Sequence, residues 1–313
     1  MPRRRKWRRV LLGALLAALS MVFLVPAGVN AWLDRGVVPM TTQQKRVTSK
    51  DGTIIAYETS GSGPALVIVS AALADRTGTT RLANHLARHF TVVNYDRRGR
   101  GQSSDTPPYA VEREVEDIET LIEAEGGSTF VFGSSSGAVL ALDAASRLGP
   151  KVQRLFLYEP PFIVDTSRPP MPRDFSHQVS GLVSSGQRND AVKLFFAKGM
   201  GLPGFAVTMM RWLMPGWSKM ASVAHTIPYD LAVLDGTQSG EPLPAGRWSG
   251  TTAPTLVEVG SRSEPFFHAG ARALVPLLAH ANYRALDGRD HSAILMATKA
   301  LSDEITPFFL SAR

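Results

Sequence analysis

Hydrophobic and polar positions along most of this chain repeat with the two periods of strands and helices. Two alternating runs flank Asp51-Gly52 between residues 46 and 59, a pattern that predicts a β-hairpin. Short apolar runs typical of buried strands follow at 64–69, 91–95, 129–132, 152–158, 255–259 and 283–286. Helical patterns lie between or after them, in a stretch ending at His89 and at 111–125, 138–148, 269–279 and 292–310. This alternation predicts an α/β fold with a mostly parallel sheet flanked by helices.

The interval 163–252 breaks this rhythm. It contains no strand-like apolar run, and prolines and glycines divide it into helix-sized pieces. It follows the sixth predicted strand, and ligands in open α/β sheets bind beyond the carboxyl ends of the strands. We therefore expect a helical cap at 163–252 over a core made of residues 46–162 and 253–313, with a linker at 34–45.

Residues 1–33 have the pattern of a segment that directs export. Basic side chains at positions 3–9 precede the run 10–33, which carries no charge. Such an arrangement is typical of a secretory signal or a signal anchor, and the run is long enough to cross a bilayer. Small-x-small patterns at 25–27 and 29–31 could be cleaved. We expect an exported body, either membrane-anchored through residues 10–33 with its N-terminus cytoplasmic, or secreted.

Composition and charge exclude several functions. The 313 residues are 44% hydrophobic and 19% charged, as in an ordinary globular protein. The net charge of +7 is concentrated at residues 3–9, which hold six basic side chains; the 304 residues from 10 to 313 carry 28 basic and 27 acidic ones. A nearly neutral body without a basic stripe argues against nucleic-acid binding. No cluster of side chains has metal-ligand spacing, so we expect neither metal nor cofactor.

The segment 133–137 reads Gly-Ser-Ser-Ser-Gly, between a predicted strand and a predicted helix. G-x-S-x-G in this context is typical of a nucleophile elbow, with Ser135 as the nucleophile. A serine hydroxyl needs a base. Of the seven histidines, His291 follows the last predicted strand, at the edge of the sheet where Ser135 also lies. We therefore predict His291 as the base.

These motifs together resemble the α/β-hydrolase superfamily, from about residue 46 to the end. The segments that carry the resemblance are 94–103 (Asn-Tyr-Asp-Arg-Arg-Gly-Arg-Gly-Gln-Ser), 133–137 and 288–291 (Gly-Arg-Asp-His). The resemblance implies the α/β-hydrolase fold with a helical cap and a Ser…acid…His order. It also implies that Asp96, Arg97 and Arg98 form a structural turn.

The acid of the triad has two candidates. Members of this superfamily usually carry it as Gly-x-x-Asp after the strand at 255–259, but Ser263 stands where that aspartate would be. Glu264 follows one residue later. The alternative is Glu159, which ends the strand after the elbow, as in members that draw their acid from this strand, including some haloalkane dehalogenases. A carboxylate at the end of an apolar strand needs a partner, and an imidazole would be one.

The oxyanion hole also departs from the superfamily's pattern. The usual His-Gly pair after the third strand is replaced here by Ser70-Ala71. Backbone N–H groups stabilise the oxyanion, so the substitution does not exclude catalysis. By position, the donors would be the N–H groups of Ala72 and Ser136.

A serine nucleophile predicts a hydrolase that cleaves an ester-type small molecule (ester, thioester or lactone) through an acyl-enzyme intermediate. The predicted cap is rich in methionine and aromatic residues, which would suit a hydrophobic acyl substrate but could equally hold the cap together. Two alternatives stay open. One is a slow-turnover ligand-binding or sensing protein on the same fold, and the other is an acyltransferase.

Overall fold

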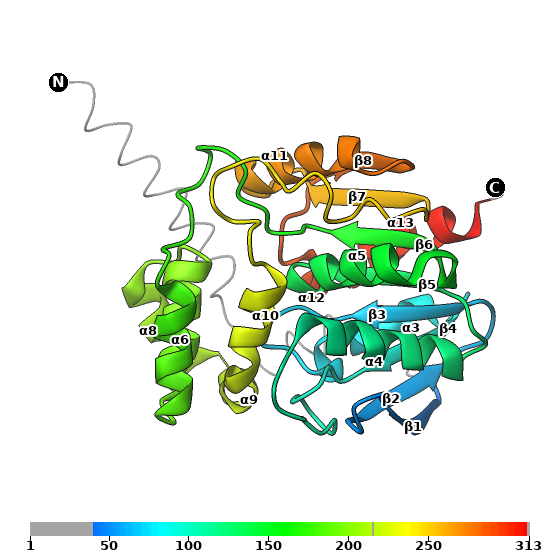
Figure 1. Ribbon diagram of the computed structural model, residues 1–313, viewed down its shortest axis with the longest axis horizontal. Coiled ribbons are helices and arrows are strands. Elements are labelled where there is room, and N and C mark those ends of the chain that lie inside the picture. The colour runs from blue at the N-terminus through cyan, green and yellow to red at the C-terminus, as the bar shows by residue number, and fades with distance from the viewer. Residues whose placement is uncertain (1–39, 215, 312–313) are drawn as a thin grey trace.

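The computed structural model describes residues 40–214 and 216–311, which form an eight-stranded sheet flanked by helices, with a helical cap at one end (Figure 1). The strands lie in the order β1-β2-β4-β3-β5-β6-β7-β8. β2 runs antiparallel to both β1 and β4, and all other neighbouring strands are parallel, so the predicted mostly parallel sheet is confirmed. The predicted signal or anchor lies outside the described residues. No helix within the described ranges is long and apolar enough to cross a membrane.

The strands lie close to the runs predicted for them. Their bounds are β1 Thr42–Thr48, β2 Ile54–Ser60, β3 Ala65–Val69, β4 Thr91–Tyr95, β5 Thr129–Ser134, β6 Val152–Tyr158, β7 Thr255–Gly260 and β8 Ala281–Leu286. The hairpin pairs Thr48 with Ile54, and Gly52 takes φ +87° in its turn. That conformation favours glycine.

The core helices depart from the prediction at two places. They are α3 Thr80–Leu86, α4 Val111–Ala124, α5 Ser136–Leu148, α11 Pro265–Leu274, α12 Ala293–Met296 and α13 Thr298–Leu310. α11 begins four residues before the predicted 269, because Pro265 has the fixed φ that suits a first helical position. The helix predicted at 292–310 is divided, since Ala297 has a non-helical backbone between α12 and α13.

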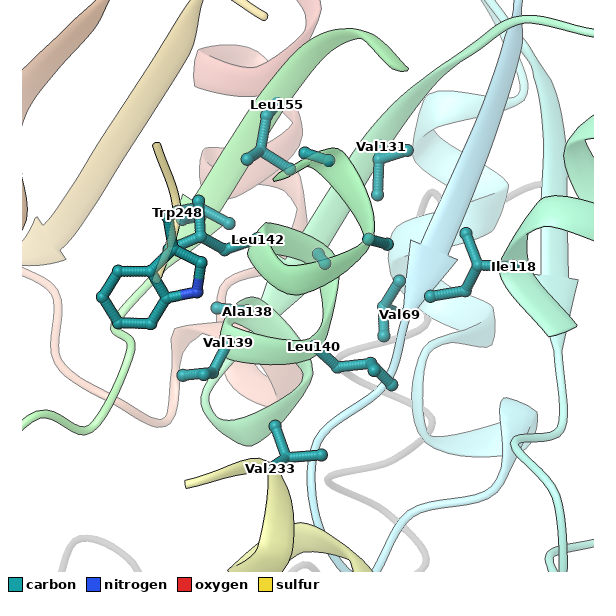
Figure 2. Close-up of a cluster of buried hydrophobic side chains, with 14 of the residues drawn as sticks. Val69, Ile118, Val131, Ala138, Val139, Leu140, Leu142, Leu155, Val233 and Trp248 are labelled. Carbon is teal, nitrogen blue, oxygen red and sulfur yellow. The ribbon is translucent and has the colours of Figure 1, made fainter. Parts of the chain in front are cut away.

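Two apolar layers cover the two faces of the sheet. α4, α5 and α11 supply one layer, and α3, α12 and α13 supply the other. Figure 2 shows α5 at the centre of the first layer, between side chains of the sheet and Val233 from the cap. α5 is therefore held from several sides, which fixes the turn at its N-terminus where Ser135 lies.

The cap is helical, as predicted, but its last part belongs to the core. Its helices are α6 Phe175–Ser184, α7 Arg188–Leu194, α8 Gly204–Leu213, α9 Trp217–Ser222 and α10 Ile227–Val233, with a π-helical turn at Phe195–Gly199. They share a cluster of their own that includes Phe196, Met210 and Trp217. Trp248, inside the predicted cap interval, instead packs on the core and donates to Asp143 Oδ1 at 2.7 Å.

Candidate active site

The turn between β5 and α5 has the geometry of a nucleophile elbow. Ser135 has φ +53° and ψ −128°, a combination that side chains rarely allow. A methyl group on Gly133 would lie 2.5 Å from the carbonyl oxygen of Gly137. One on Gly137 would lie 2.5 Å from the carbonyl oxygens of Val69 and Ser70. The two glycines thus let the turn close against the end of β3.

Within the described part of the chain, three residues other than glycine have positive φ. They are Leu73 (+59°), Ser135 (+53°) and Glu159 (+51°). Each follows a strand of the parallel sheet, after β3, β5 and β6 respectively, and these strands are neighbours. Strained backbone of this kind persists only where the surrounding structure enforces it, and it is concentrated at functional sites.

Glu159 contacts His291. Its Oε2 atom lies 2.6 Å from His291 Nδ1, although the two residues are 132 positions apart. The carboxylate is fully buried, and its other oxygen accepts the N–H of Gly260 at 2.7 Å and the hydroxyl of Ser263. With Glu159 on Nδ1, the Nε2 atom of the ring is left for other partners.

Glu264 lies elsewhere. Its side chain is 64% exposed, and its carboxylate lies 3.7 Å from Arg168 Nη1. Of the two candidate acids, the structure brings only Glu159 to the histidine. Ser263, at the position where the superfamily usually has aspartate, donates its hydroxyl to Glu159. The serine thus supports an acid that comes from the neighbouring strand.

The loop that carries His291 is held by groups that sequence analysis did not single out. The Tyr158 hydroxyl donates to the carbonyl of Asp290 at 2.8 Å. The ring of Phe267 stacks on the imidazole, with centroids 4.9 Å apart and an interplanar angle of 18°. A methyl group on Gly260 would lie 2.4 Å from the carbonyl oxygen of Arg289, so a glycine is needed here to leave room for the loop that carries His291. In the sequence, only the aromatic pair at 266–267 could have indicated the stacking of Phe267 on His291.

Ser135 is partly exposed, and its hydroxyl has no hydrogen-bond partner among the described residues. Hydrogen bonds between a nucleophile and its base are often long in unliganded enzymes and shorten when substrate binds. The structure therefore joins the acid to the histidine.

The predicted oxyanion donors need a correction. The N–H of Ala72 already donates to the Ser136 side chain, at 2.9 Å from Oγ. In the described ranges, the N–H groups of Leu73 and Ser136 donate to no acceptor. Buried backbone N–H groups are nearly always paired, and Leu73 is 7% exposed. Leu73 therefore fits the role of donor better than Ala72 does, while Ser136 keeps its predicted N–H.

Two buried arginines replace the missing His-Gly pair as supports of the loop after β3. Arg100 Nη1 donates to the carbonyl of Ala71 at 2.7 Å, and Arg97 Nη1 reaches that of Ser70 at 3.3 Å. Because the two arginines hold these carbonyl oxygens on one side of the loop, its N–H groups can point to the opposite side. The predicted structural turn at 96–98 is thus also connected to the candidate oxyanion hole.

Asp230 of α10 joins this support to the cap. Its carboxylate accepts from Arg97 and Arg100 at 2.6 Å each, and from Ser136 Oγ at 2.9 Å. Glu114 pairs with the other side of Arg97 at 2.7 Å. Burial alone would raise the pKa of Glu114, but the charge of Arg97 lowers it. Two carboxylates thus balance two guanidinium groups, and no signal in the sequence marked Asp230.

A further carboxyl, that of Glu258, is buried near the Glu159–His291 pair. Glu258 on β7 is fully buried, and both its oxygens lack a partner among the described residues. Burial raises its pKa to about 8, and the negative charges of Glu304 and Glu159 add to this effect. The side chain is therefore mostly neutral at pH 7, so it competes little with Glu159 for the histidine's positive charge.

The described residues contain no group of three or more His, Asp or Glu side chains that could hold a metal ion. The arrangement consists of a strained serine, a carboxylate–histidine pair and two unpaired backbone N–H groups. Chemically, these are the parts needed to transfer a proton from a hydroxyl and to stabilise a developing oxyanion.

Comparison with known proteins finds hydrolases of the same family. A solved structure of an alpha/beta hydrolase from Sphaerobacter thermophilus DSM 20745 is 45% identical, with a TM-score of 0.78, over 85% of this chain and 100% of that chain. "Uncharacterized hydrolase YraK" of Bacillus subtilis (strain 168) is 38% identical over 113 residues, 35% of this chain and 42% of the relative. N-formylmaleamate deformylase of Pseudomonas putida is 34% identical over 104 residues, 32% of this chain and 39% of the relative.

The aligned regions thus span about two fifths of the length of these two curated relatives. A model of the alpha/beta hydrolase family, in contrast, matches residues 66–304, which include β3 from its second residue on, the elbow, the cap and the histidine loop. Fold, site geometry and family match lead to one conclusion: the chain belongs to the alpha/beta hydrolase family.

Proposed function

We propose that this alpha/beta hydrolase is a serine hydrolase that cleaves an ester-type small molecule (ester, thioester or lactone) through an acyl-enzyme intermediate. Ser135 attacks the acyl carbon, and His291 takes the serine proton and then delivers it to the leaving group. Glu159 orients the imidazole and stabilises its charged form. The N–H groups of Leu73 and Ser136 receive the oxyanion, and water, activated by His291, releases the acid.

The observation that carries this proposal is the coincidence of strain and chemistry. The positive φ angles at Leu73, Ser135 and Glu159 belong to the residues given the roles of oxyanion donor, nucleophile and acid. A fold under no functional constraint would have no reason to strain these three positions together. The 2.6 Å contact between Glu159 and His291 adds the orientation that the base needs.

Labelling with a fluorophosphonate tests the proposal, because this reagent reacts only with an activated serine. We expect the label at Ser135 alone, located by mass spectrometry, and none in the Ser135→Ala variant. In that variant, turnover of an activated ester should fall by roughly 10³-fold or more. Folded protein that takes no label would instead support the ligand-binding alternative. Product analysis with an added alcohol would separate hydrolysis from acyl transfer.

We also infer that residues 1–33 export this body, which would then act outside the cytoplasm. The support is the basic cluster followed by 24 uncharged residues. N-terminal sequencing of the mature protein from membrane and secreted fractions would distinguish an uncleaved anchor from a cleaved signal. An unprocessed N-terminus in a cytosolic fraction would contradict export.

A further inference from the structure

One residue of the core belongs to the apolar cluster of the cap. That residue is Leu73, which follows β3 where the strand ends on the side of the sheet that faces the cap (Figure 1). The other buried members of the cluster all lie between residues 175 and 227, and the partly buried ones between 171 and 231. Among the described residues, Leu73 is therefore the only one from the core that is buried in this cluster. It is also the residue whose N–H the proposed mechanism assigns to the oxyanion hole.

The backbone of Leu73 is strained. Its φ angle of +59° lies in the left-handed region, where the Cβ atom of an L-residue crowds the neighbouring carbonyl group. Burial of a leucine side chain contributes a free energy of the same order as the cost of this conformation. The cap cluster can thus offset the strain. Without that burial, residue 73 would be driven towards negative φ, and its peptide group would turn.

Hydrogen bonds fix the backbone on both sides of Leu73 but not at Leu73 itself. Arg100 Nη1 donates to the carbonyls of Ala71 and Ala74, at 2.7 Å and 3.2 Å. In the described part of the chain, the N–H of Leu73 donates to no acceptor. The contact that fixes residue 73 is therefore the apolar one between its side chain and the cap.

We propose that Leu73 is a positioning residue whose side chain, held in the cap, aims the N–H of the same residue at the oxyanion. The inference rests on the proposed serine hydrolase function and deepens it, because it makes the packing of the cap a condition for transition-state stabilisation. Asp230 supports the carbonyls of the loop through Arg100, whereas Leu73 fixes its own N–H by apolar burial. A cap loosened around Leu73 would leave Glu159 on His291 and weaken only the oxyanion hole.

A purely structural role for this leucine makes a different prediction. Its side chain would then be equivalent to any other of similar size in the cap cluster, and removing either would loosen the cap by a similar amount. Met210 of α8 is such a residue, since it is buried in the same cluster and has no part in the proposed reaction. Leu73→Ala and Met210→Ala therefore form a matched pair that separates positioning from packing.

The rate of fluorophosphonate labelling of the full-length protein tests the proposal, because the phosphonyl oxygen takes the place of the oxyanion as the bond to Ser135 forms. The labelled fraction at completion counts the competent sites. Per labelled site, we expect Leu73→Ala to lower the labelling rate and the kcat for an activated ester about 10–100-fold, with KM and the pH profile nearly unchanged. Met210→Ala should stay within about threefold of wild type, although both variants should unfold at a lower temperature.

Two further substitutions at position 73 separate the side chain from the backbone. Leu73→Met keeps an apolar side chain that adapts to the cluster, so it should retain at least about a third of the wild-type rate. Leu73→Gly permits positive φ without strain but places nothing in the cap, and it should be as slow as Leu73→Ala. Equal rates for Leu73→Ala and Met210→Ala, or a wild-type rate for Leu73→Gly, would overturn the proposal alone. Wild-type protein that takes no label would overturn the proposed function, and this inference with it.

Discussion

The two sides of the candidate site are built differently. On the acid side, the loops after β6, β7 and β8 bring together Glu159, Gly260, Ser263 and His291, all from the core. On the oxyanion side, the loop after β3 depends on Arg97 and Arg100 and, through them, on Asp230 of the cap. The acid side can therefore form without the cap, whereas the oxyanion side requires it.

This difference shows two ways in which the fold can retain the parts of a catalytic site when a residue usual in the superfamily is absent. On the acid side, the carboxylate has moved to the neighbouring strand, and the serine left at the usual position supports it. On the oxyanion side, buried charges hold backbone carbonyls in place of a His-Gly pair. The second solution makes the site sensitive to cap position, because the cap contributes one of the charges.

The largest effect is expected from breaking the acid side. Glu159→Gln should lower kcat about 10³–10⁴-fold, because the amide cannot stabilise the imidazolium and can hold the wrong tautomer. Steady-state kinetics on an activated ester measure this loss. Glu264→Gln is the matched control, and its activity should stay at the wild-type level.

A loss of activity in Glu264→Gln with none in Glu159→Gln would show that Glu264, and not Glu159, is the acid of the triad. A Ser263→Asp change in the Glu159→Gln background sharpens the test, since it returns a carboxylate to the superfamily's usual position. Recovery of about tenfold or more would show that the two positions serve one histidine.

Breaking the charged support of the oxyanion side should affect both stability and turnover. Asp230→Asn leaves Arg100 buried with neutral partners only, so the free energy of unfolding should fall by about 3–5 kcal/mol. In the protein that remains folded, kcat should fall at least about tenfold while the pH dependence assigned to His291 stays unchanged. Denaturant titration and a pH–rate profile measure the two effects.

Asp235→Asn provides the control, since this exposed aspartate follows the same cap helix. Its free energy of unfolding should change by less than about 0.5 kcal/mol. If Asp230→Asn lost stability but kept its full kcat, this would contradict the inference that the cap supports the oxyanion loop through Asp230.

The acid side should also show a stability that falls as pH rises above 4.5, whereas the lowered pKa of Glu114 on the oxyanion side affects stability only at lower pH. The pKa of Glu258 is about 8 in the folded protein against a reference of 4.5. Above pH 4.5 the unfolded chain loses this proton while the folded protein keeps it, so the contribution to stability falls as pH rises to about 8 and is constant beyond. Glu258→Gln should remove about 2–4 kcal/mol of this dependence.

Urea unfolding of both proteins at pH 5 and pH 8 measures the difference, at roughly the two ends of the window set by these pKa values. Equal slopes of stability against pH for wild type and variant would contradict the assignment to Glu258.

The smallest effect is expected from the serines beside the nucleophile. Ser136→Ala keeps the backbone N–H but removes the acceptor of Ala72 and the donor to Asp230, so kcat should fall about tenfold. Ser134→Ala is the matched control, because its buried hydroxyl has no partner in the described structure. Its kcat should not change, and equal losses in both variants would point to packing of the elbow instead.

The sequence by itself determined the sheet, the elbow and the histidine loop, because each depends on local pattern. Strand and helix periods are read along the chain, and a strained turn needs glycines close to its serine, here at 133 and 137. Glu159 could also be named as a candidate acid from the sequence, since a carboxylate that ends an apolar strand requires a partner.

Only the tertiary structure decided which acid meets His291 and which N–H groups stay unpaired. Glu159 and Glu264 look alike as sequence, yet packing buries one against the histidine and exposes the other. Asp230 gave no signal, because its partners lie on segments more than 90 residues away in the chain. Hydrogen-bond partners of buried charges depend on how distant segments meet, and that information is absent from local periodicity.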